Sequence, residues 1–137
     1  HSFPTRRSSD LSVVDPAELV KLAGLKNAHG LGISQVVPYP YMPNLPVIRE
    51  YQALLAKHAP GEHVNYTSFE QFLGAKVLVE ALRRAGPNPT RARVHEALES
   101  LRKFDLGGLS LSYSADDHSG LDFSDLSIIG PDGHFRR

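Results

Sequence analysis

The sequence predicts an α/β fold in which helices pack on strands, and three observations support this prediction. Residues 67–85 form a long helical pattern that ends at a Gly-Pro pair, and a second helical pattern follows it at once. Residues 109–114 alternate strictly between apolar and polar side chains, as a half-buried strand does. Residues 31–37 end in β-branched side chains, which is typical of a strand. A chain of 137 residues is long enough to bury a core.

The first predicted helix has a clear start and a clear end. Asp15 provides an N-cap, Pro16 occupies the first helical position, and Gly24 can end the helix. We expect residues 25–30 to form a polar connection to the strand at 31–37.

The next segment is rich in proline. It contains Pro38, Pro40, Pro43 and Pro46. Because proline lacks a backbone N–H, this segment is predicted to be a stiff, extended crossing without a regular hydrogen-bond ladder. A helix is predicted to begin at Pro46 and to end at residues 59–61. Its expected inward residues are Val47, Ile48, Tyr51, Leu54 and Leu55.

The long helix at 67–85 is predicted to begin with a capping box between Ser68 and Gln71. Its polar residues form one narrow stripe, which predicts a helix that is buried on most sides. That stripe consists of Lys76, Glu80, Arg83 and Arg84.

The second helix is predicted to open at residues 88–90 and to place four apolar residues on one face: Val94, Ala97, Leu98 and Leu101. The strand at 109–114 is expected to lead into a polar turn at 115–120. A final strand at 126–129 and a turn at 131–133 complete the prediction.

The order of these segments resembles a known family. The run YTSFEQFLGAKVLVEALRRAG is followed by ALESL, FDLGG and LSYSADDHSG, while GISQVVPYP and PVIREYQALL precede it and DGHF closes the chain. The sequence resembles the C-terminal part of type I periplasmic solute-binding proteins, and in particular the branched-chain amino-acid-binding type. The resemblance covers roughly residues 12–135. One departure is Gln71-Phe72, where the family more often has Gly-Tyr.

The resemblance implies a partial type I fold and a function in transport. Residues 12–137 would be the C-terminal portion, with pieces of both lobes, a proline-rich hinge near 36–46 and a C-terminal β-hairpin. It implies the substrate-binding component of an ABC transporter, which captures a small polar solute by lobe closure. The solute would be a branched-chain or other amino acid, or an amide. The partner would be an inner-membrane ABC permease and the location periplasmic or extracytoplasmic, with neither catalysis nor a cofactor.

Three aromatic residues are the expected ligand contacts: Tyr39, Tyr66 and Phe69. They lie beside the expected hinge or at a helix start, where backbone N–H groups and an aromatic wall can meet a ligand. The alternative is that they are core aromatics. The resemblance implies that most ligand-binding groups lie upstream of residue 12.

Residues 1–11 have no periodic pattern of helix or strand, and they match the translation of a common sequencing-library adapter. We therefore expect this segment to be a disordered artefact outside the fold, with the natural N-terminus missing. A natural disordered basic arm is the alternative. The signal peptide that the resemblance implies is not present in the sequence.

Composition narrows the possible functions. Fifteen basic and fifteen acidic residues cancel, so no charge excess favours nucleic acid or an anionic membrane. No apolar run approaches the roughly 20 residues that span a bilayer, so no membrane insertion is expected. Cysteine is absent, which excludes disulfides and thiolate chemistry. No serine lies in a Gly-x-Ser-x-Gly elbow.

No metal site is expected from the sequence. His58 and His63 lack further ligands at helical spacing, and residues 116–118 have no third ligand nearby in the sequence. Asp122 and Asp125 are expected at the surface rather than as a catalytic pair.

Three other functions stay open: a stand-alone helical interaction module, a ligand-sensing domain of the same fold, and a small enzyme. An enzyme would need a pocket with converging titratable groups. A portion of a larger lobe should instead expose a large unpaired apolar face. The basic residues Arg83, Arg84, Arg91 and Arg93 are expected on a solvated helix face, with a partner contact as the alternative.

Overall fold

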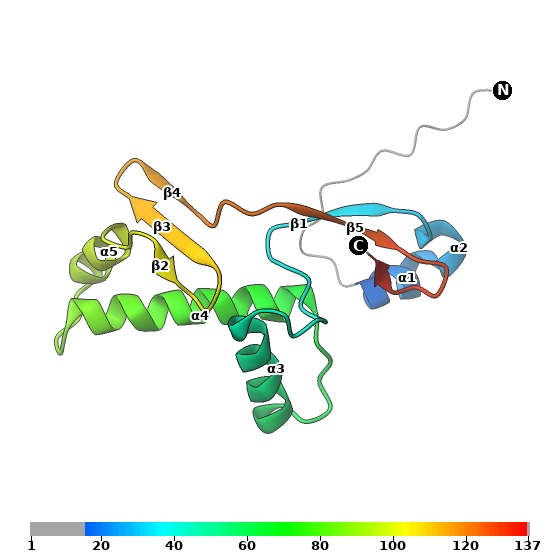
Figure 1. Cartoon of the computed structure of the whole chain (residues 1–137), viewed down its shortest axis with the longest axis horizontal. Helices are drawn as coiled ribbons and strands as arrows, with labels where there is room; N and C mark the ends of the chain where they lie inside the picture. The colour runs from blue at the N-terminus through cyan, green and yellow to red at the C-terminus, as the bar shows by residue number, and fades with distance from the viewer. Residues whose placement is uncertain (1–15, 137) are drawn as a thin grey trace. The chain divides into compact units, whose positions relative to one another are not determined.

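The computed structural model describes residues 16–136, and it confirms the α/β fold (Figure 1). The helices are α1 (Pro16–Ala23), α2 (Leu25–Ala28), α3 (Pro46–His58), α4 (Tyr66–Ala85) and α5 (Arg91–Glu99). The strands are β1 (Gly32–Gln35), β2 (Phe104–Asp105), β3 (Ser110–Ser114), β4 (Asp117–Gly120), β5 (Asp125–Ile129) and β6 (Phe135–Arg136). The expectations for residues 1–11 and for the Asp15 cap lie outside the described residues.

The described chain divides into two compact units. The first unit contains residues 16–38 and 124–136, and the second contains residues 39–123. Each unit has its own antiparallel three-stranded sheet, with order β1-β5-β6 in the first and β2-β3-β4 in the second.

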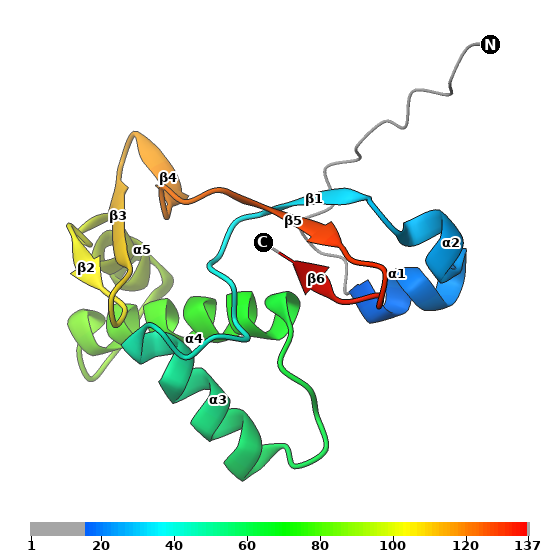
Figure 2. The ribbon, with the colours of Figure 1, turned by 45° about the vertical axis from the view of Figure 1, so that its right-hand side comes forward.

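In the first unit, β5 is the central strand. Ile33 of β1 pairs with Ser127, and Ile129 pairs with Phe135 of β6. The β5–β6 pair is the predicted C-terminal hairpin, with α1 and α2 in the same unit (Figure 2). Its turn passes close to Val20 of α1, and Gly133 in this turn has a φ of +79°, which favours glycine.

Two expectations for the first unit need correction. The strand predicted over 31–37 ends at Gln35, because only residues 32–35 pair with β5. The polar connection at 25–30 contains the short helix α2, whose Ala28 is fully buried. Gly24 ends α1 as predicted, and its N–H donates to the carbonyl of Val20 at 2.8 Å.

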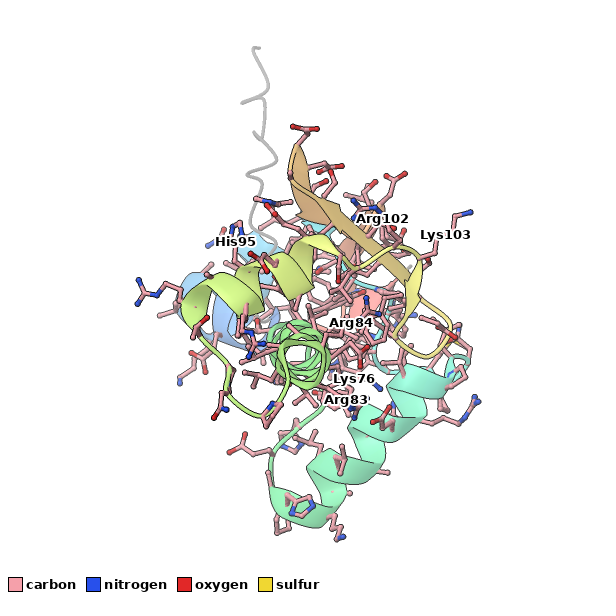
Figure 3. The ribbon with its side chains drawn as sticks, turned by 90° about the vertical axis from the view of Figure 1, so that its left-hand side faces the viewer. Lys76, Arg83, Arg84, His95, Arg102 and Lys103 are labelled. Atoms are coloured by element: carbon pink, nitrogen blue, oxygen red, sulfur yellow. The ribbon has the colours of Figure 1, made fainter. Side chains whose placement is uncertain are left out.

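In the second unit, α4 is the longest helix and contributes one buried stripe. Figure 3 looks along α4 and shows α3, α5 and the β2-β3-β4 sheet around it. The buried residues follow one another at spacings of three or four, which is the period of one helix face. They are Tyr66, Phe69, Leu73, Val77, Ala81 and Ala85. At the C-terminal end of this stripe, Ala81 and Ala85 pack with Ala97 of α5, and Val94 and Leu98 lie against them, as the sequence predicted.

The predicted N-cap of α4, Ser68, is wrong by three residues. The N-cap is Asn65, whose side-chain oxygen accepts the backbone N–H of Ser68 at 2.8 Å. Ser68 itself lies inside the helix, where its hydroxyl bonds to Tyr51 instead of capping. Asn65 is also a residue type that caps helices well, and it precedes Ser68 in the sequence. The Ser68 hydroxyl is instead hydrogen-bonded to Tyr51 of α3, so Asn65 serves as the cap.

The prediction that α4 is buried on most sides is also wrong. Leu78, Val79 and Leu82 are 50%, 55% and 40% exposed. The helices and strands of the second unit cover only the stripe described above, so the apolar residues beyond it face outward. We call Leu78, Val79 and Leu82 the open face of α4.

The sheet of the second unit contains a strand where a turn was expected. Residues 117–120 form β4 and pair with β3, with Ser112 opposite Gly120 and an irregular register near Ser114. Their composition has little strand propensity. Pairing with the well-patterned β3 therefore decides their conformation, and propensity alone does not.

The loop between β2 and β3 fixes the start of α3. The carbonyl of Gly107 accepts the N–H of Val47 at 3.0 Å. The Asp105 carboxylate accepts the N–H groups of Gly108 and Gly107 at 2.7 and 2.8 Å. These two hydrogen bonds, that from Gly108 first, lower the pKa of Asp105 below its ordinary value.

Candidate functional site

Three tyrosine side chains come together in the second unit, and we call them the tyrosine cluster. The rings of Tyr39 and Tyr41 have centroids 4.9 Å apart. Tyr66 meets both rings edge-on, at 6.3 Å from Tyr39 and 6.0 Å from Tyr41. These are the distances and tilted geometries that aromatic pairs prefer. The cluster therefore joins the proline-rich segment to the first residue of α4 through contacts between aromatic rings.

The proline-rich segment is anchored on α3 through its carbonyl groups. The side-chain amide of Gln52 donates to the carbonyl of Pro40 at 2.8 Å. The guanidinium of Arg49 donates to the carbonyl of Pro43 at 2.9 Å. Because the segment forms no strand, these side chains supply the hydrogen bonds that a ladder would otherwise supply. They hold Tyr39 and Tyr41 in place beside Tyr66.

The start of α4 is anchored in the same way. The hydroxyl of Tyr51 on α3 is hydrogen-bonded to the Ser68 hydroxyl, and it accepts the N–H of Asn65 at 3.3 Å. The ring of Tyr51 packs against Phe69, with centroids 5.1 Å apart. Tyr51 thus joins the polar cap of α4 to the apolar core beneath it.

The three residues expected from the sequence differ in accessibility. Tyr39 is partly exposed, whereas Tyr66 is buried and Phe69 is fully buried in the core. Phe69 therefore has no surface that a ligand could touch in this structure. Tyr39 and Tyr66 are brought together, and Phe69 lies on the next turn of α4.

Sequence reasoning missed Tyr41, which is 36% exposed and is the most accessible member of the tyrosine cluster. The signal was present in the sequence, because Tyr39, Pro40 and Tyr41 follow one another in a segment that proline keeps extended. The partly exposed rings of Tyr39 and Tyr41 offer apolar faces beside polar hydroxyl groups. Such a surface suits a small solute that has both an aliphatic part and a polar part.

The basic side chains on α4, which are labelled in Figure 3, are paired with carboxylates. Lys76 forms an ion pair with Glu50 of α3, while Arg83 and Arg84 hold the Glu80 carboxylate at 3.0 and 2.9 Å. The hydrogen bond from Arg84 is the main cause of the lowered pKa of Glu80. Arg83 and Arg84 are exposed, in agreement with a solvated helix face. These pairings reduce the positive charge available to an anionic partner.

Comparison with solved structures identifies the fold as that of type I periplasmic binding proteins. A substrate-binding periplasmic protein from Ralstonia solanacearum is 38% identical, with a TM-score of 0.79, over 90% of this chain and 36% of that one. A possible leucine/isoleucine/valine-binding protein from Rhodopirellula baltica is 29% identical, with a TM-score of 0.79. The match covers 88% of this chain and 32% of that one. A branched-chain amino acid ABC transporter protein from Thermus thermophilus, with bound valine, is 25% identical, with a TM-score of 0.69. The match covers 90% of this chain and 35% of that one.

The family model for periplasmic binding proteins matches residues 12–122, and the chain therefore belongs to this family. It spans about a third of the length of the solved structures that it matches. Among curated proteins, none matches the chain. Within residues 16–136, no helix has the length and apolar character needed to cross a membrane.

Proposed function

We propose that this chain is the C-terminal portion of the substrate-binding component of an ABC transporter. In this proposal the complete protein works outside the cytoplasm. It captures a small polar solute, which is a branched-chain or other amino acid or an amide, and delivers it to an inner-membrane permease. The observation that carries the proposal is the family match over residues 12–122. The likeness to a structure with bound valine supports the choice of solute.

We propose that the proline-rich segment near 36–46 is one of the hinge crossings of this protein. The division between the two compact units falls at 38/39, inside this segment, and again at 123/124. The two strands that lead to these crossings, β1 and β5, are paired through Gln35 and Asp125. A hinge needs a few residues that absorb dihedral change between rigid flanks, and this pairing supplies one rigid flank.

We further propose that Tyr39 and Tyr41 contact the solute directly, while Tyr66 supports them. Phe69 then acts only through packing, because it is fully buried. Binding of the solute would favour the closed arrangement of the lobes over the open one, as a ligand that contacts both lobes must. No covalent chemistry is needed for this function.

The open face of α4 supports the idea that a larger fold surrounds these elements. Large apolar side chains at Leu78, Val79 and Leu82 are the kind of surface that another element normally covers. The same face also favours the second candidate, a stand-alone module that binds a partner protein through α4. The two candidates differ in what covers the face: a segment of the same protein in the first, and a different protein in the second.

We expect the 137-residue chain alone to bind amino acids only weakly, with dissociation constants above about 1 mM. The physical reason is that one partial tyrosine surface cannot satisfy the ammonium and carboxylate groups of the solute, which lose their hydration on binding. Calorimetric titration with leucine, isoleucine, valine, glutamine and asparagine measures this. Micromolar affinity for any of them would contradict the proposal that most ligand contacts lie in the rest of the protein.

A further inference from the structure

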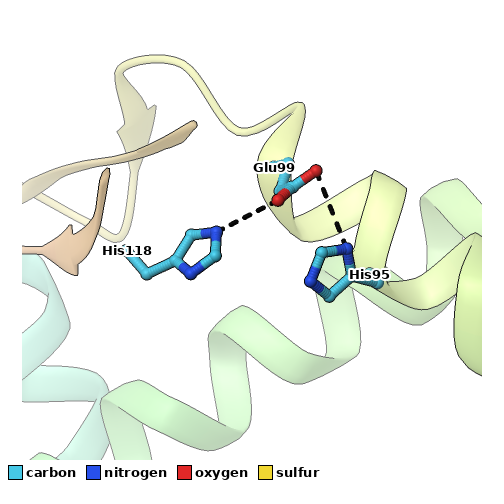
Figure 4. A group of neighbouring side chains, drawn as sticks. All are labelled: His95, Glu99 and His118. Atoms are coloured by element: carbon cyan, nitrogen blue, oxygen red, sulfur yellow. Dashed lines mark hydrogen bonds and ion pairs between the residues drawn. The ribbon is translucent and has the colours of Figure 1, made fainter. Parts of the chain in front are cut away.

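A group of metal-ligating side chains forms between α5 and β4, away from the tyrosine cluster. His95 and Glu99 are four residues apart on α5, so they lie on the same helix face one turn apart. His118 lies on β4 and points toward the same carboxylate (Figure 4). The sequence did not predict this group, because His118 is 19 residues from Glu99 and only the fold brings them together.

Each histidine nitrogen lies close to one of the two oxygen atoms of the Glu99 carboxylate. His118 Nε2 lies 3.1 Å from Glu99 Oε1, and His95 Nδ1 lies 3.6 Å from Glu99 Oε2. One donor atom from each residue lies within 4.8 Å of the others. Zinc binds histidine nitrogen and carboxylate oxygen at about 2.0–2.2 Å, so two of its tetrahedral donors lie about 3.4 Å apart. Both imidazoles are exposed, so they are free of the core packing that would prevent rotation toward this geometry.

The surroundings leave room for an ion and for a fourth ligand. The three side chains line a pocket of about 220 Å³ together with Leu98 and Tyr113. The two imidazoles are exposed and Glu99 is half-buried, so an ion can enter from solvent and a water molecule can complete its coordination. The imidazole rings of His95 and His118 meet edge-on, with centroids 5.9 Å apart, so they do not stack on each other.

We propose that His95, Glu99 and His118 form a zinc-binding site of the His₂Glu type. The ion would connect the last turn of α5 to the β3–β4 hairpin, two elements that are otherwise joined through the core residue Leu101 and the N–H of Tyr113, which donates to the Leu101 carbonyl at 2.9 Å. The proposed zinc site requires neither the solute nor closure of the lobes. It goes beyond the proposed function and does not depend on it.

The alternative is that the two imidazoles only hydrogen-bond to the Glu99 carboxylate. Exposed ion pairs of this kind contribute little to the free energy of unfolding. Hydrogen bonding alone therefore stabilises this arrangement of three side chains only slightly. The two possibilities differ in one measurable property, which is whether the chain binds one zinc ion with these residues as ligands.

The test is calorimetric titration of the full 137-residue chain with zinc chloride, for the wild type and for His95→Ala, Glu99→Gln, His118→Ala and His58→Ala. His58 is an exposed histidine at the end of α3, outside the group, and serves as the matched control. We expect one zinc ion per chain in the wild type and in His58→Ala. Loss of residues that merely support a ligand costs about 10–100-fold in affinity, so each variant within the group should lose at least about 100-fold.

Thermal unfolding with and without zinc provides a second readout. Zinc should raise the melting temperature of the wild type and of His58→Ala, and it should leave that of His118→Ala unchanged. The proposal is overturned if the wild type does not bind zinc, or if His118→Ala and His95→Ala bind it as tightly as His58→Ala. Neither result bears on amino-acid binding, so this test and that of the proposed function fail independently.

Discussion

Replacing Phe69 with alanine is expected to lower the free energy of unfolding by about 3–5 kcal/mol, which is the usual cost of truncating a buried phenylalanine. Phe69 is fully buried on α4, and its ring packs against Tyr51 of α3. The truncation would leave a cavity under Tyr51, whose hydroxyl also holds Ser68 and Asn65 at the start of α4. Urea unfolding followed by circular dichroism measures the loss.

Leu78→Ala is the matched control, because it removes a large apolar side chain from the open face of the same helix. Leu78 is half exposed, so we expect a change of about 0.5 kcal/mol or less. Equal losses for Phe69→Ala and Leu78→Ala would contradict the assignment of the buried stripe. The comparison also separates packing from helix propensity, since both substitutions place alanine within α4.

Gly107→Ala is expected to destabilise the second unit by at least about 2 kcal/mol. Gly107 has a φ of +108°, a conformation that costs a residue with a side chain about 1–3 kcal/mol. An added Cβ would also lie 3.1 Å from the backbone nitrogen of Val47, and crowding of this kind costs about 1–3 kcal/mol. The neighbour is backbone at the first turn of α3, so it cannot rotate away as a flexible side chain could.

Gly74→Ala should have the opposite sign and controls for the loss of a glycine as such. Gly74 lies inside α4 with nothing within 4 Å of the added Cβ, and alanine is the better helix former by about 0.5–1 kcal/mol. Thermal unfolding of Gly107→Ala, Gly74→Ala and the wild type measures both changes in stability. A Gly107→Ala variant as stable as the wild type would show that the β2–β3 loop does not pack on α3 in this way.

The sequence predicted those elements whose own residues carry a complete signal. Pro46 marks the start of α3, Gly24 ends α1, and the alternation at 110–114 gives β3. These signals are local, because they depend on backbone angles and on which residues share a face. The family resemblance was likewise carried by the order of ordinary segments along the chain, and the family match confirms it.

The features that sequence reasoning missed depend on contacts between distant residues. β4 exists because β3 pairs with it, and Asn65 caps α4 in place of Ser68, whose hydroxyl bonds to Tyr51. The open face of α4 could not be told from a buried one, because an apolar pattern does not show which side receives a partner. The convergence of His95 and Glu99 with His118 is of the same kind, since only the fold places β4 beside α5.

The most direct test of the proposed function is calorimetric titration of the protein encoded by the complete reading frame that contains this chain, whatever its length. The ligands are the same amino acids and amides, and Tyr39→Ala and Tyr41→Ala are compared with Leu78→Ala. We predict binding of one solute per protein, weakened more than about tenfold by either tyrosine substitution and unchanged by the control, where tenfold corresponds to about 1.4 kcal/mol. A folded protein that binds none of these solutes would contradict the account.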